Sequence, residues 1–386
     1  MTRQALVPPI AEVPPEVEQL RVEVRTFLAG ELSGGRFTPR CDAWLAGWDE
    51  EFSRALARRG WIGMTLPPEY GGHGRSTLER FAVTEELLAA GAPVAAHWIA
   101  DRQMGPSLLR FGTDQQKQRF LPAIARGECF FGIGMSEPDA GSDLASVRMR
   151  ASGGDGGWIL DGTKVWTSGA HHAHALVVLA RTEAVDPDNR HGGLSQFIVM
   201  TDSPGLTINP IRLLTGEHHF NEVVFDGVVV PDELVLGTIG NGWQQVTSEL
   251  AFERSGPERI LSTYPLLAHV VACVRLSGDG SHHPQMGALL ARLWTLRQMS
   301  LAIASSLGGG VAADVPAALV KDLGTRFESE VIELARLVLD VEPDPTSTDP
   351  GARLLAQAEL HAPGFTIRGG TNEILRGVVA RAVGLR

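Results

Sequence analysis

Two short segments of this sequence combine residue types that can hold a flat, polar ring. Residues 133–142 read Ile-Gly-Met-Ser-Glu-Pro-Asp-Ala-Gly-Ser, and residues 166–168 read Trp-Thr-Ser. Glycine and alanine let a backbone approach a ligand closely, so its amides can donate hydrogen bonds together with the hydroxyls of Ser136 and Ser142. Trp166 offers a large aromatic face, followed by two hydroxyl residues. The pairing predicts a site for a redox-active ring with a polar edge.

No common nucleotide-binding loop accompanies these segments. The sequence has no Gly-x-Gly-x-x-Gly after a strand-like run and no Gly-x-x-x-x-Gly-Lys-Ser/Thr, so neither a Rossmann nor a P-loop site is predicted. Taken alone, the Gly-Ser-Asp of residues 141–143 is typical of an ordinary turn, and a tryptophan in a strand is usually a core residue. The two segments together favour a flavin site over both of these interpretations.

The elements that must position these residues follow from hydrophobic spacing. After a Pro-rich arm at residues 1–15, helices are predicted over Glu16–Leu32, Trp48–Arg59, Leu78–Ala90 and Asp114–Arg126, with Thr113 as the N-cap of the last. From residue 130 to about residue 237, short runs separated by Gly, Pro, Asn and Asp predict an antiparallel β domain. Its predicted strands are Gly157–Leu160, Ala175–Ala180, Ser195–Met200, Leu206–Ile208, Glu222–Phe225 and Val228–Val230. Helical spacing then returns over Ala251–Leu276, Gln285–Leu307, Ala317–Leu339 and Ala352–His361.

Composition limits the class of protein. The chain of 386 residues is long enough for two or three domains, and a formal charge of −11 argues against nucleic acid or an anionic membrane as partner. Three widely spaced cysteines fit a reducing compartment, and neither a membrane-spanning run nor a signal-peptide pattern is found. We therefore expect a cytoplasmic protein. Because the histidines lack converging cysteine or carboxylate ligands, no metal site is predicted.

Four further segments support one family resemblance. They read Thr-Leu-Pro-Pro-Glu-Tyr-Gly-Gly at residues 65–72, Gly-Thr-Asp-Gln-Gln-Lys-Gln-Arg-Phe-Leu-Pro at residues 112–122, Phe-Asp-Gly-Val-Val-Val-Pro at residues 225–231 and Gly-Gly-Thr-Asn-Glu-Ile at residues 369–374. With the two flavin segments, this set resembles the acyl-CoA dehydrogenase family over nearly the whole chain. The resemblance implies an α+β fold with an N-terminal all-α domain (1–130), a middle antiparallel β domain (131–238) and a C-terminal four-helix bundle (239–386).

The resemblance also implies FAD as the cofactor and an acyl-CoA thioester as the substrate. The residues that it assigns to FAD are Ile133, Gly134, Met135, Ser136, Gly141, Ser142, Trp166, Thr167, Ser168, Thr371 and Glu373. Those that it assigns to the substrate are Ser142, Arg254, Gly369 and Gly370.

The reaction implied is removal of the α-proton of the thioester with hydride transfer from Cβ to the flavin. It needs a carboxylate base and a donor for the thioester oxygen. Many family members carry the base where this chain has Gly369, which still offers its backbone amide as the donor. The family's second position for the base is a Glu-Arg pair on the first helix after the β domain. Here that pair is Glu253-Arg254, so Glu253 is the predicted base.

The sequence departs from the family pattern in the C-terminal region. An Arg-x-x-Phe-Gly segment has no clear counterpart at residues 274–285, and residues 341–351 replace a Gln-x-x-Gly-Gly-x-Gly segment that contacts FAD. These departures resemble those of a bacterial branch of the family that degrades steroids and acids, some members of which are heteromers. We therefore expect a homodimer or homotetramer, with a heterotetramer as the alternative, and an electron-transfer flavoprotein as acceptor. A subunit that supplies only part of an FAD site, an oxidase and a carrier-protein thioester dehydrogenase remain open.

Overall fold

The computed structural model describes residues 6–254, 256–278 and 280–385, with the side chains of residues 249–253 excepted. Its contacts divide the chain into two compact units. We call Asp49–Gly74 with Ala95–Leu250 the sheet unit, and Met1–Trp48 with Arg75–Val94 and Ala251–Arg386 the bundle unit. The predicted domain limits near residues 130 and 238 stay a prediction.

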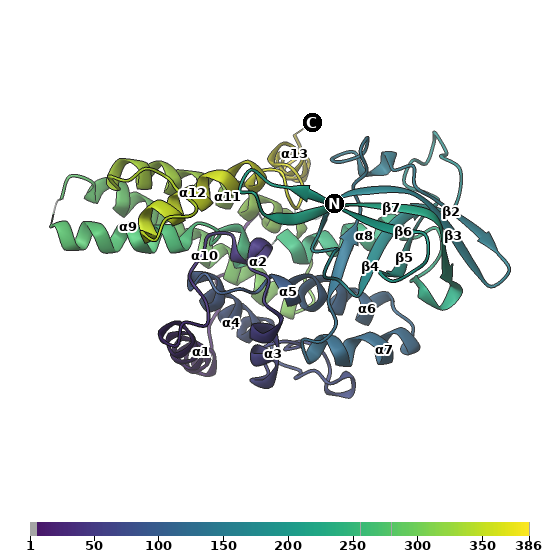
Figure 1. The fold of residues 1–386 in the computed structure, drawn as a ribbon, viewed down its shortest axis with the longest axis horizontal. Coiled ribbons are helices and arrows are strands. Elements are labelled where there is room, and N and C mark those ends of the chain that lie inside the picture. Colours follow the sequence, from purple (N-terminus) through teal and green to yellow (C-terminus); the bar gives the residue numbers. More distant parts are fainter. Residues whose placement is uncertain (1–5, 255, 279, 386) are drawn as a thin grey trace. The chain divides into compact units, whose positions relative to one another are not determined.

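A mixed β-sheet forms the centre of the sheet unit (Figure 1). Its strands are β1 (Phe131–Gly134), β2 (Arg150–Gly154), β3 (Gly157–Ser168), β4 (Ala175–Arg181), β5 (Leu194–Met200), β6 (Leu206–Arg212), β7 (His218–Pro231) and β8 (Val235–Leu236). They run in the order β6-β7-β3-β2-β4-β5-β8, with β1 beside β4. Most neighbours are antiparallel as predicted, but β1 and β2 pair with β4 in parallel. The chain between β1 and β4 is long enough for the crossover that parallel pairing requires.

Helices cover one side of this sheet and share its core. They are α5 (Ala95–Ile99), η2 (Ala100–Met104), α6 (Gly105–Phe111) and α7 (Asp114–Ala125), and they follow α3 (Glu50–Arg58) in the chain. Apolar residues of α6 and α7, such as Leu108 and Phe120, pack with Phe131 and Phe197 of the sheet. Thr113 caps α7 as predicted, because its side chain accepts from Gln116 N and the Gln116 side chain bonds back.

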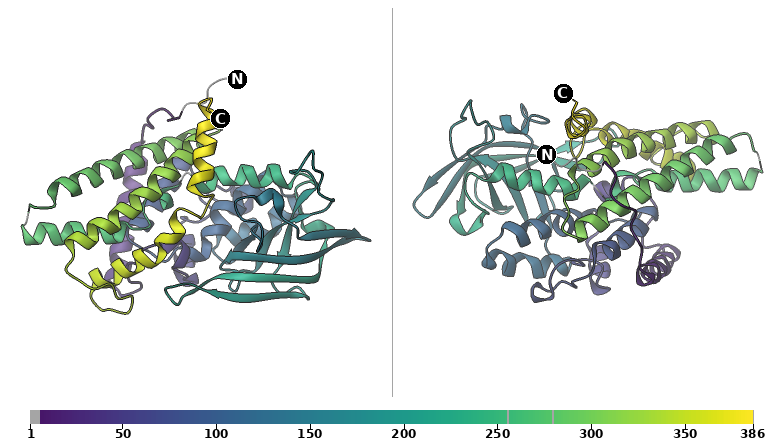
Figure 2. Two further views of the ribbon diagram at one scale, coloured as in Figure 1. Left: turned by 90° about the horizontal axis from the view of Figure 1, so that it is seen from above. Right: turned by 180° about the vertical axis from the view of Figure 1, so that it is seen from behind.

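The bundle unit consists of helices from both ends of the chain. They are α1 (Pro15–Ser33), α2 (Ala43–Ala46), α4 (Thr77–Ala89), α9 (Tyr264–Ser277), α10 (His283–Gly308), α11 (Asp314–Val338), α12 (Pro350–Phe365) and α13 (Asn372–Ala382). Helix α11 contacts α9, α10, α12 and α13, so it is the central helix of the bundle (Figure 2). Helix α4 packs between α1 and α10. A buried ion-pair cluster joins Arg21 of α1 to Glu85 and Glu86 of α4.

One predicted helix is wrong. Ala251–Leu276 was predicted to be continuous, but α8 (Gly242–Arg254) ends first and α9 begins only at Tyr264, with a short 3-10 turn at Pro257–Arg259 between them. Gly256 and Pro257 explain the break, because proline lacks the N–H that a helix needs and restricts the residue before it. In the part of the chain that is described, no helix is long and apolar enough to cross a membrane.

Candidate active site

The loop that follows β1 is fastened onto strand β3 by a buried ion pair. Glu137 accepts from Arg148 N at 2.6 Å and from Met149 N at 2.9 Å. Its Oε1 also lies 2.8 Å from Nζ of Lys164, which donates to Met135 O at 3.0 Å. Burial lowers the pKa of Lys164 to about 8, although the neighbouring Glu137 acts in the opposite direction. The pair therefore fixes the backbone on both sides of the loop's first turn.

This anchoring leaves the distal part of the loop exposed. Val165 N donates to Ser136 O at 2.9 Å, and residues 137–140 close a tight turn by two reciprocal backbone bonds. Gly141 and Ser142 follow on the surface, and a Cβ at Gly141 would meet nothing within 4 Å. Their N–H groups donate to no acceptor in the described part of the chain. The loop therefore presents two peptide donors to solvent, and their predicted contact with a flavin stays a prediction.

Trp166 occupies a strained position at the edge of this loop. The register of β3 against β7 shifts between Lys164 and Thr167, and Trp166 in this bulge has φ +60°. A bulky residue with positive φ costs about 1–3 kcal/mol and marks a position that the surrounding structure enforces. The indole is 56% exposed and touches Phe220 edge-on at a centroid distance of 5.8 Å. The bulge thus holds a large aromatic face toward solvent.

The two hydroxyl residues after Trp166 lie differently. Ser168 is half-buried, whereas Thr167 is completely buried and its Oγ1 has no hydrogen-bond partner among the described residues. Asn221, also completely buried, donates to Thr167 O at 2.9 Å and so fixes the backbone after the bulge. Ser168 can therefore reach a ligand with its hydroxyl, while the structure does not expose the hydroxyl of Thr167.

Histidines brace the end of β3. The ring of His171 stacks on His218 at 3.8 Å and lies 4.0 Å from His172. His171 Nδ1 and His218 Nε2 lie 3.1 and 2.7 Å from Oδ1 of Asn221. Burial lowers the pKa of His171 to about 4. In the described residues, no group of three or more His, Cys, Asp or Glu side chains could hold a metal ion.

The other predicted contacts of the sheet unit lie next to the exposed loop. Ile133 and Gly134 are in β1, and Met135 is the first residue after it. Ile133, Met135 and Ser136 are half-buried, and Gly134 is buried. An exposed indole, unpaired peptide donors and half-exposed polar side chains in one unit fit the flat, polar flavin ring of FAD. The sheet unit therefore carries a set of residues suited to this cofactor.

A second set of predicted residues lies in the bundle unit. Glu253 belongs to the last turn of α8, but its side chain lies outside the described part of the structure. The next residue, Arg254, is half-buried and donates from Nε to Gly369 O at 2.9 Å. This bond ties the end of α8 to the Gly369-Gly370 turn between α12 and α13.

The Gly369-Gly370 turn requires glycine at both positions. The φ angles are +68° and +92°, in the region that side chains with a Cβ rarely adopt. A Cβ on Gly370 would also lie 3.1 Å from Nη2 of Arg254. The N–H groups of Gly369 and Gly370 donate to no acceptor among the residues that the structure describes. The turn thus offers backbone donors, and the predicted role of the Gly369 amide toward the thioester oxygen stays a prediction.

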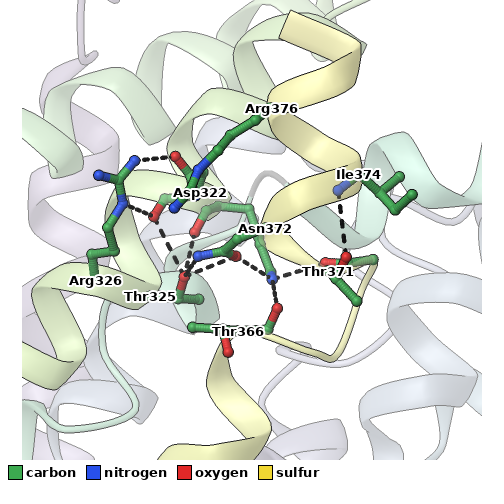
Figure 3. Close-up of polar contacts among 10 residues, drawn as sticks. Asp322, Thr325, Arg326, Thr366, Thr371, Asn372, Ile374 and Arg376 are labelled. Carbon is green, nitrogen blue, oxygen red and sulfur yellow. Dashed lines mark hydrogen bonds and ion pairs between the residues drawn. The ribbon is translucent and has the colours of Figure 1, made fainter. Parts of the chain in front are cut away.

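The turn leads into α13 through a polar network (Figure 3). Thr371 caps α13 by accepting from Ile374 N at 3.4 Å, and Glu373 is exposed in the first helical turn. Asn372 is buried, and its side chain exchanges hydrogen bonds with Thr325 of α11. The capping bond of Thr371 competes with any contact that its hydroxyl makes to a ligand.

Sequence reasoning missed two buried lysines. Lys164 anchors the exposed loop, and Lys321 of α11 donates to Thr366 O before the Gly369-Gly370 turn and to Gly370 O within it. The sequence contains only three lysines, and these two are completely buried. Each stands in an apolar or strand-like run, which is unusual for a residue that is rarely buried without a partner. A lysine in such a run, in a sequence with so few lysines, was the signal that could have pointed to these two residues.

The fold is that of a flavin-dependent dehydrogenase, and comparison with known proteins gives the family. Residues 14–128 match the description "Acyl-CoA dehydrogenase, N-terminal domain" and residues 132–228 match "Acyl-CoA dehydrogenase, middle domain". The chain is 37% identical over 385 residues to the acyl-CoA dehydrogenase IpdE1 of Mycobacterium tuberculosis, covering 95% of this chain and 97% of that protein. The chain belongs to the acyl-CoA dehydrogenase family.

Solved structures agree in fold and in length. The chain is similar to the "Tcur3481-Tcur3483 steroid ACAD" with a TM-score of 0.85 and 28% identity, over 99% of this chain and 100% of that one. It is similar to the ChsE4-ChsE5 complex from Mycobacterium tuberculosis with a TM-score of 0.82 and 29% identity, over 97% of this chain and 99% of that one. Members of this family are FAD-dependent flavoproteins, and this chain is an oxidoreductase that acts on acyl-CoA.

Proposed function

We propose that this enzyme converts an acyl-CoA thioester to its trans-2-enoyl-CoA, with Glu253 as the base. The observation that carries the redox part of this proposal is the exposed Trp166 with its left-handed backbone. It follows Val165, whose N–H is bonded to Ser136 O in the loop that carries the unpaired amides of Gly141 and Ser142. FAD bound to these residues supplies the acceptor for the hydride that leaves Cβ. The side chains proposed to line it are those of Ile133, Met135, Ser136, Ser142, Trp166 and Ser168 in the sheet unit, with Thr371 and Glu373 in the bundle unit.

Proton removal needs a carboxylate whose pKa is raised toward about 6–7 by a dry environment. Position 369, where many family members carry the base, has no side chain here. Glu253 follows Leu250, Ala251 and Phe252 on α8, and this apolar run favours such an environment. The bond from Arg254 to Gly369 O supports the assignment, because it links the helix end that carries Glu253 to the turn that carries the donors.

The enolate that forms as the α-proton leaves must be stabilised at the thioester oxygen. The Gly369 N–H is the proposed donor, with Gly370 and Arg254 beside the substrate. A peptide donor held in place before the reaction costs no reorganisation when charge develops, and one such donor contributes about 10²–10³-fold in rate. The missing side chain at position 369 does not affect this role.

A single substitution tests the base. Glu253→Gln is isosteric, so the purified variant should remain yellow with the FAD content of the wild type. Addition of acyl-CoA should leave its flavin absorbance unchanged on the time scale on which the wild-type absorbance bleaches. Bleaching of the variant at the wild-type rate contradicts the role of Glu253.

The acyl group proposed is bulky and polycyclic, and the acceptor proposed is an electron-transfer flavoprotein. The proposed acyl group is supported by the likeness to a steroid acyl-CoA dehydrogenase. The sequence itself does not define the depth of the acyl pocket. Flavin bleaching with a panel of straight-chain, branched and steroid-derived CoA thioesters tests it. Faster bleaching by octanoyl-CoA than by a steroid side-chain thioester contradicts the substrate class but not the reaction.

A second candidate function is that of a subunit completing a partner's flavin site. It is favoured by the irregular segment between α11 and α12, at residues 341–349, where the family has an FAD-contacting motif. Two similar structures are also named as pairs of proteins. Expression of the chain alone distinguishes the two functions. Yellow protein with one FAD per chain supports a homodimer or homotetramer, whereas colourless protein that becomes yellow on co-expression with a partner supports a heterotetramer.

A further inference from the structure

A completely buried lysine in α11 contacts the Gly369-Gly370 turn from behind. We infer that Lys321 is a positioning residue, which holds this turn so that its peptide N–H groups face the thioester oxygen. The inference rests on the proposed function, because it assigns to Lys321 the placement of the proposed oxyanion donors. Nothing in the family motifs points to this residue.

The three bonds of Lys321 explain how it acts. Its Nζ donates to Thr366 O at 3.2 Å, to Gly370 O at 2.9 Å and to Asn372 Oδ1 at 2.8 Å. An ammonium group has three donors, so it can serve these three acceptors at once. Thr366 is the C-cap of α12 and Asn372 is the first residue of α13. A single nitrogen atom therefore joins the end of one helix, the turn and the start of the next helix.

The carbonyl groups of the turn are held by two cations. Arg254 donates a hydrogen bond to Gly369 O, and Lys321 donates one to Gly370 O. Because a trans peptide is planar, fixing a carbonyl also fixes the N–H of the following residue in the opposite direction. The turn consists of two glycines and is otherwise among the most flexible sequences possible. Arg254 thus sets the direction of the Gly370 N–H, and Lys321 sets that of the Thr371 N–H. The N–H of Gly369 shares its peptide plane with Arg368, so its direction depends on how firmly the chain is held on both sides of it.

The residue before the turn is also fixed. Arg368 forms bonds of 2.7 Å to both carboxylate oxygens of Asp42 and one of 2.9 Å to Ser262 Oγ. Its guanidinium lies over the ring of Trp44 at 4.5 Å. Lys321 closes residues 366–370 by binding both ends, so Gly369 lies between two fixed points. Removal of Lys321 breaks its bonds at both ends, at Thr366 O and Gly370 O, while the Arg368 contacts remain.

The charge of Lys321 suits its position. The C-terminal end of α12 carries a partial negative charge from its helix dipole, and the ammonium binds the cap carbonyl there. The neighbouring Asp322 is engaged elsewhere, by Arg326 of α11 and by Nε of Arg376 at 3.1 Å (Figure 3). The ion pair of Arg326 and Asp322 thus lies one residue from Lys321 without binding the turn. It offers a matched control.

The test compares Lys321→Met with Arg326→Gln in the holoenzyme. The substrate probe is the acyl-CoA of the panel above that bleaches the wild-type flavin fastest, and the binding probe is its S-alkyl thioether, which lacks the carbonyl. Lys321→Met should bleach about 10²-fold more slowly, as expected for donors displaced by about 1 Å. Its FAD content and its affinity for the thioether should stay within about threefold of the wild type, since neither depends on the oxyanion donors. Arg326→Gln should behave as the wild type.

Other outcomes separate the inference from the proposed function. Wild-type bleaching rates in Lys321→Met overturn the inference alone, and so does a parallel loss of thioether affinity, which indicates a purely structural role. If Lys321→Met does not fold, Lys321→Gln, which keeps two donors, replaces it in the same comparison. Its bleaching rate should be lower than those of the wild type and Arg326→Gln, but not lost completely. If no thioester bleaches the wild type, the proposed function fails and the inference fails with it.

Discussion

Nζ of Lys164 lies 2.8 Å from Oε1 of Glu137, and neither side chain is more than 8% exposed. This pair joins strand β3 to the loop that carries Gly141 and Ser142. Glu137 also receives two backbone N–H groups, so its charge is neutralised by three donors. The exposed donors of the loop therefore depend on a buried ion pair.

Lys164→Met is expected to weaken both folding and cofactor binding. Removing one partner of a buried ion pair costs about 3–5 kcal/mol, because the other charge stays buried. The loop also loses its bond at Met135 O. Thermal unfolding and the ratio of FAD to protein after gel filtration measure the two effects. Lys117→Met is the control, since its partner Asp114 is exposed and such a pair contributes about 0–1 kcal/mol. Equal melting temperatures for the two variants contradict the prediction.

Substitution of Trp166 separates the effect of its backbone strain from that of its proposed contact with the flavin. At φ +60° glycine is favoured over alanine by about 1–2 kcal/mol. We therefore expect the apoprotein of Trp166→Gly to be more stable in urea than that of Trp166→Ala. Both variants should bind FAD about tenfold more weakly or worse, since each loses an aromatic stacking contact of about 1.5 kcal/mol. Wild-type FAD affinity in both variants is the result that removes Trp166 from the site.

Gly370→Ala is expected to slow the reaction while FAD stays bound. The new Cβ would combine a φ of +92° with a 3.1 Å approach to Nη2 of Arg254, so the turn must move. A displacement of about 1 Å at a reacting group costs about 10²-fold in rate. Stopped-flow bleaching measures this loss. The control is Gly364→Ala in α12, where a Cβ meets nothing within 4 Å, and it should leave the bleaching rate unchanged.

Regular periodic segments of the fold could be predicted from the sequence, and irregular ones could not. The predicted helix Glu16–Leu32 agrees with α1 to within a residue at each end, because its apolar face is continuous. Strand β7 was predicted as two pieces because Asp226-Gly227 is typical of a turn, yet β3 and β6 hold it in one sheet. Strand β3 was predicted only as far as Leu160, since polar residues and the bulge at Trp166 hide its alternation.

The candidate site divides in the same way. Residues of the exposed loop and of the Gly-Gly turn are contiguous, so their chemistry can be read from short motifs. Lys164 and Lys321 act on carbonyl oxygens that lie far away in the sequence, and any residue supplies a carbonyl. No motif can record such partners. Motifs can therefore nominate candidate ligand contacts, whereas the lysines that hold these segments emerge only from the structure.

A buried carboxyl group in the bundle unit gives a last prediction. Glu328 of α11 is completely buried, and its Oε1 accepts from Ser262 N at 2.8 Å. Its Oε2 has no hydrogen-bond partner in the described part of the chain. Burial raises the pKa of Glu328 to about 7 from 4.5, against the opposing effect of Arg368. Between about pH 4.5 and pH 7, Glu328 is therefore protonated in the folded state but ionised in the unfolded state.

Glu328→Gln should remove the resulting pH dependence of stability. Because the folded pKa lies above the unfolded one, the wild type is most stable below about pH 4.5 with respect to this group and loses stability as the pH rises to about 7. The loss is roughly 3 kcal/mol, at 1.36 kcal/mol per pKa unit. The glutamine keeps an acceptor for Ser262 N and stays neutral, so the variant should equal the wild type at pH 5 and exceed it at pH 8. Urea unfolding at both pH values measures the difference, with Glu330→Gln, an exposed position on the same helix, as control. A variant that is less stable than the wild type at pH 8 shows that the ionised carboxylate has a stabilising partner, and the predicted proton on Glu328 is then absent.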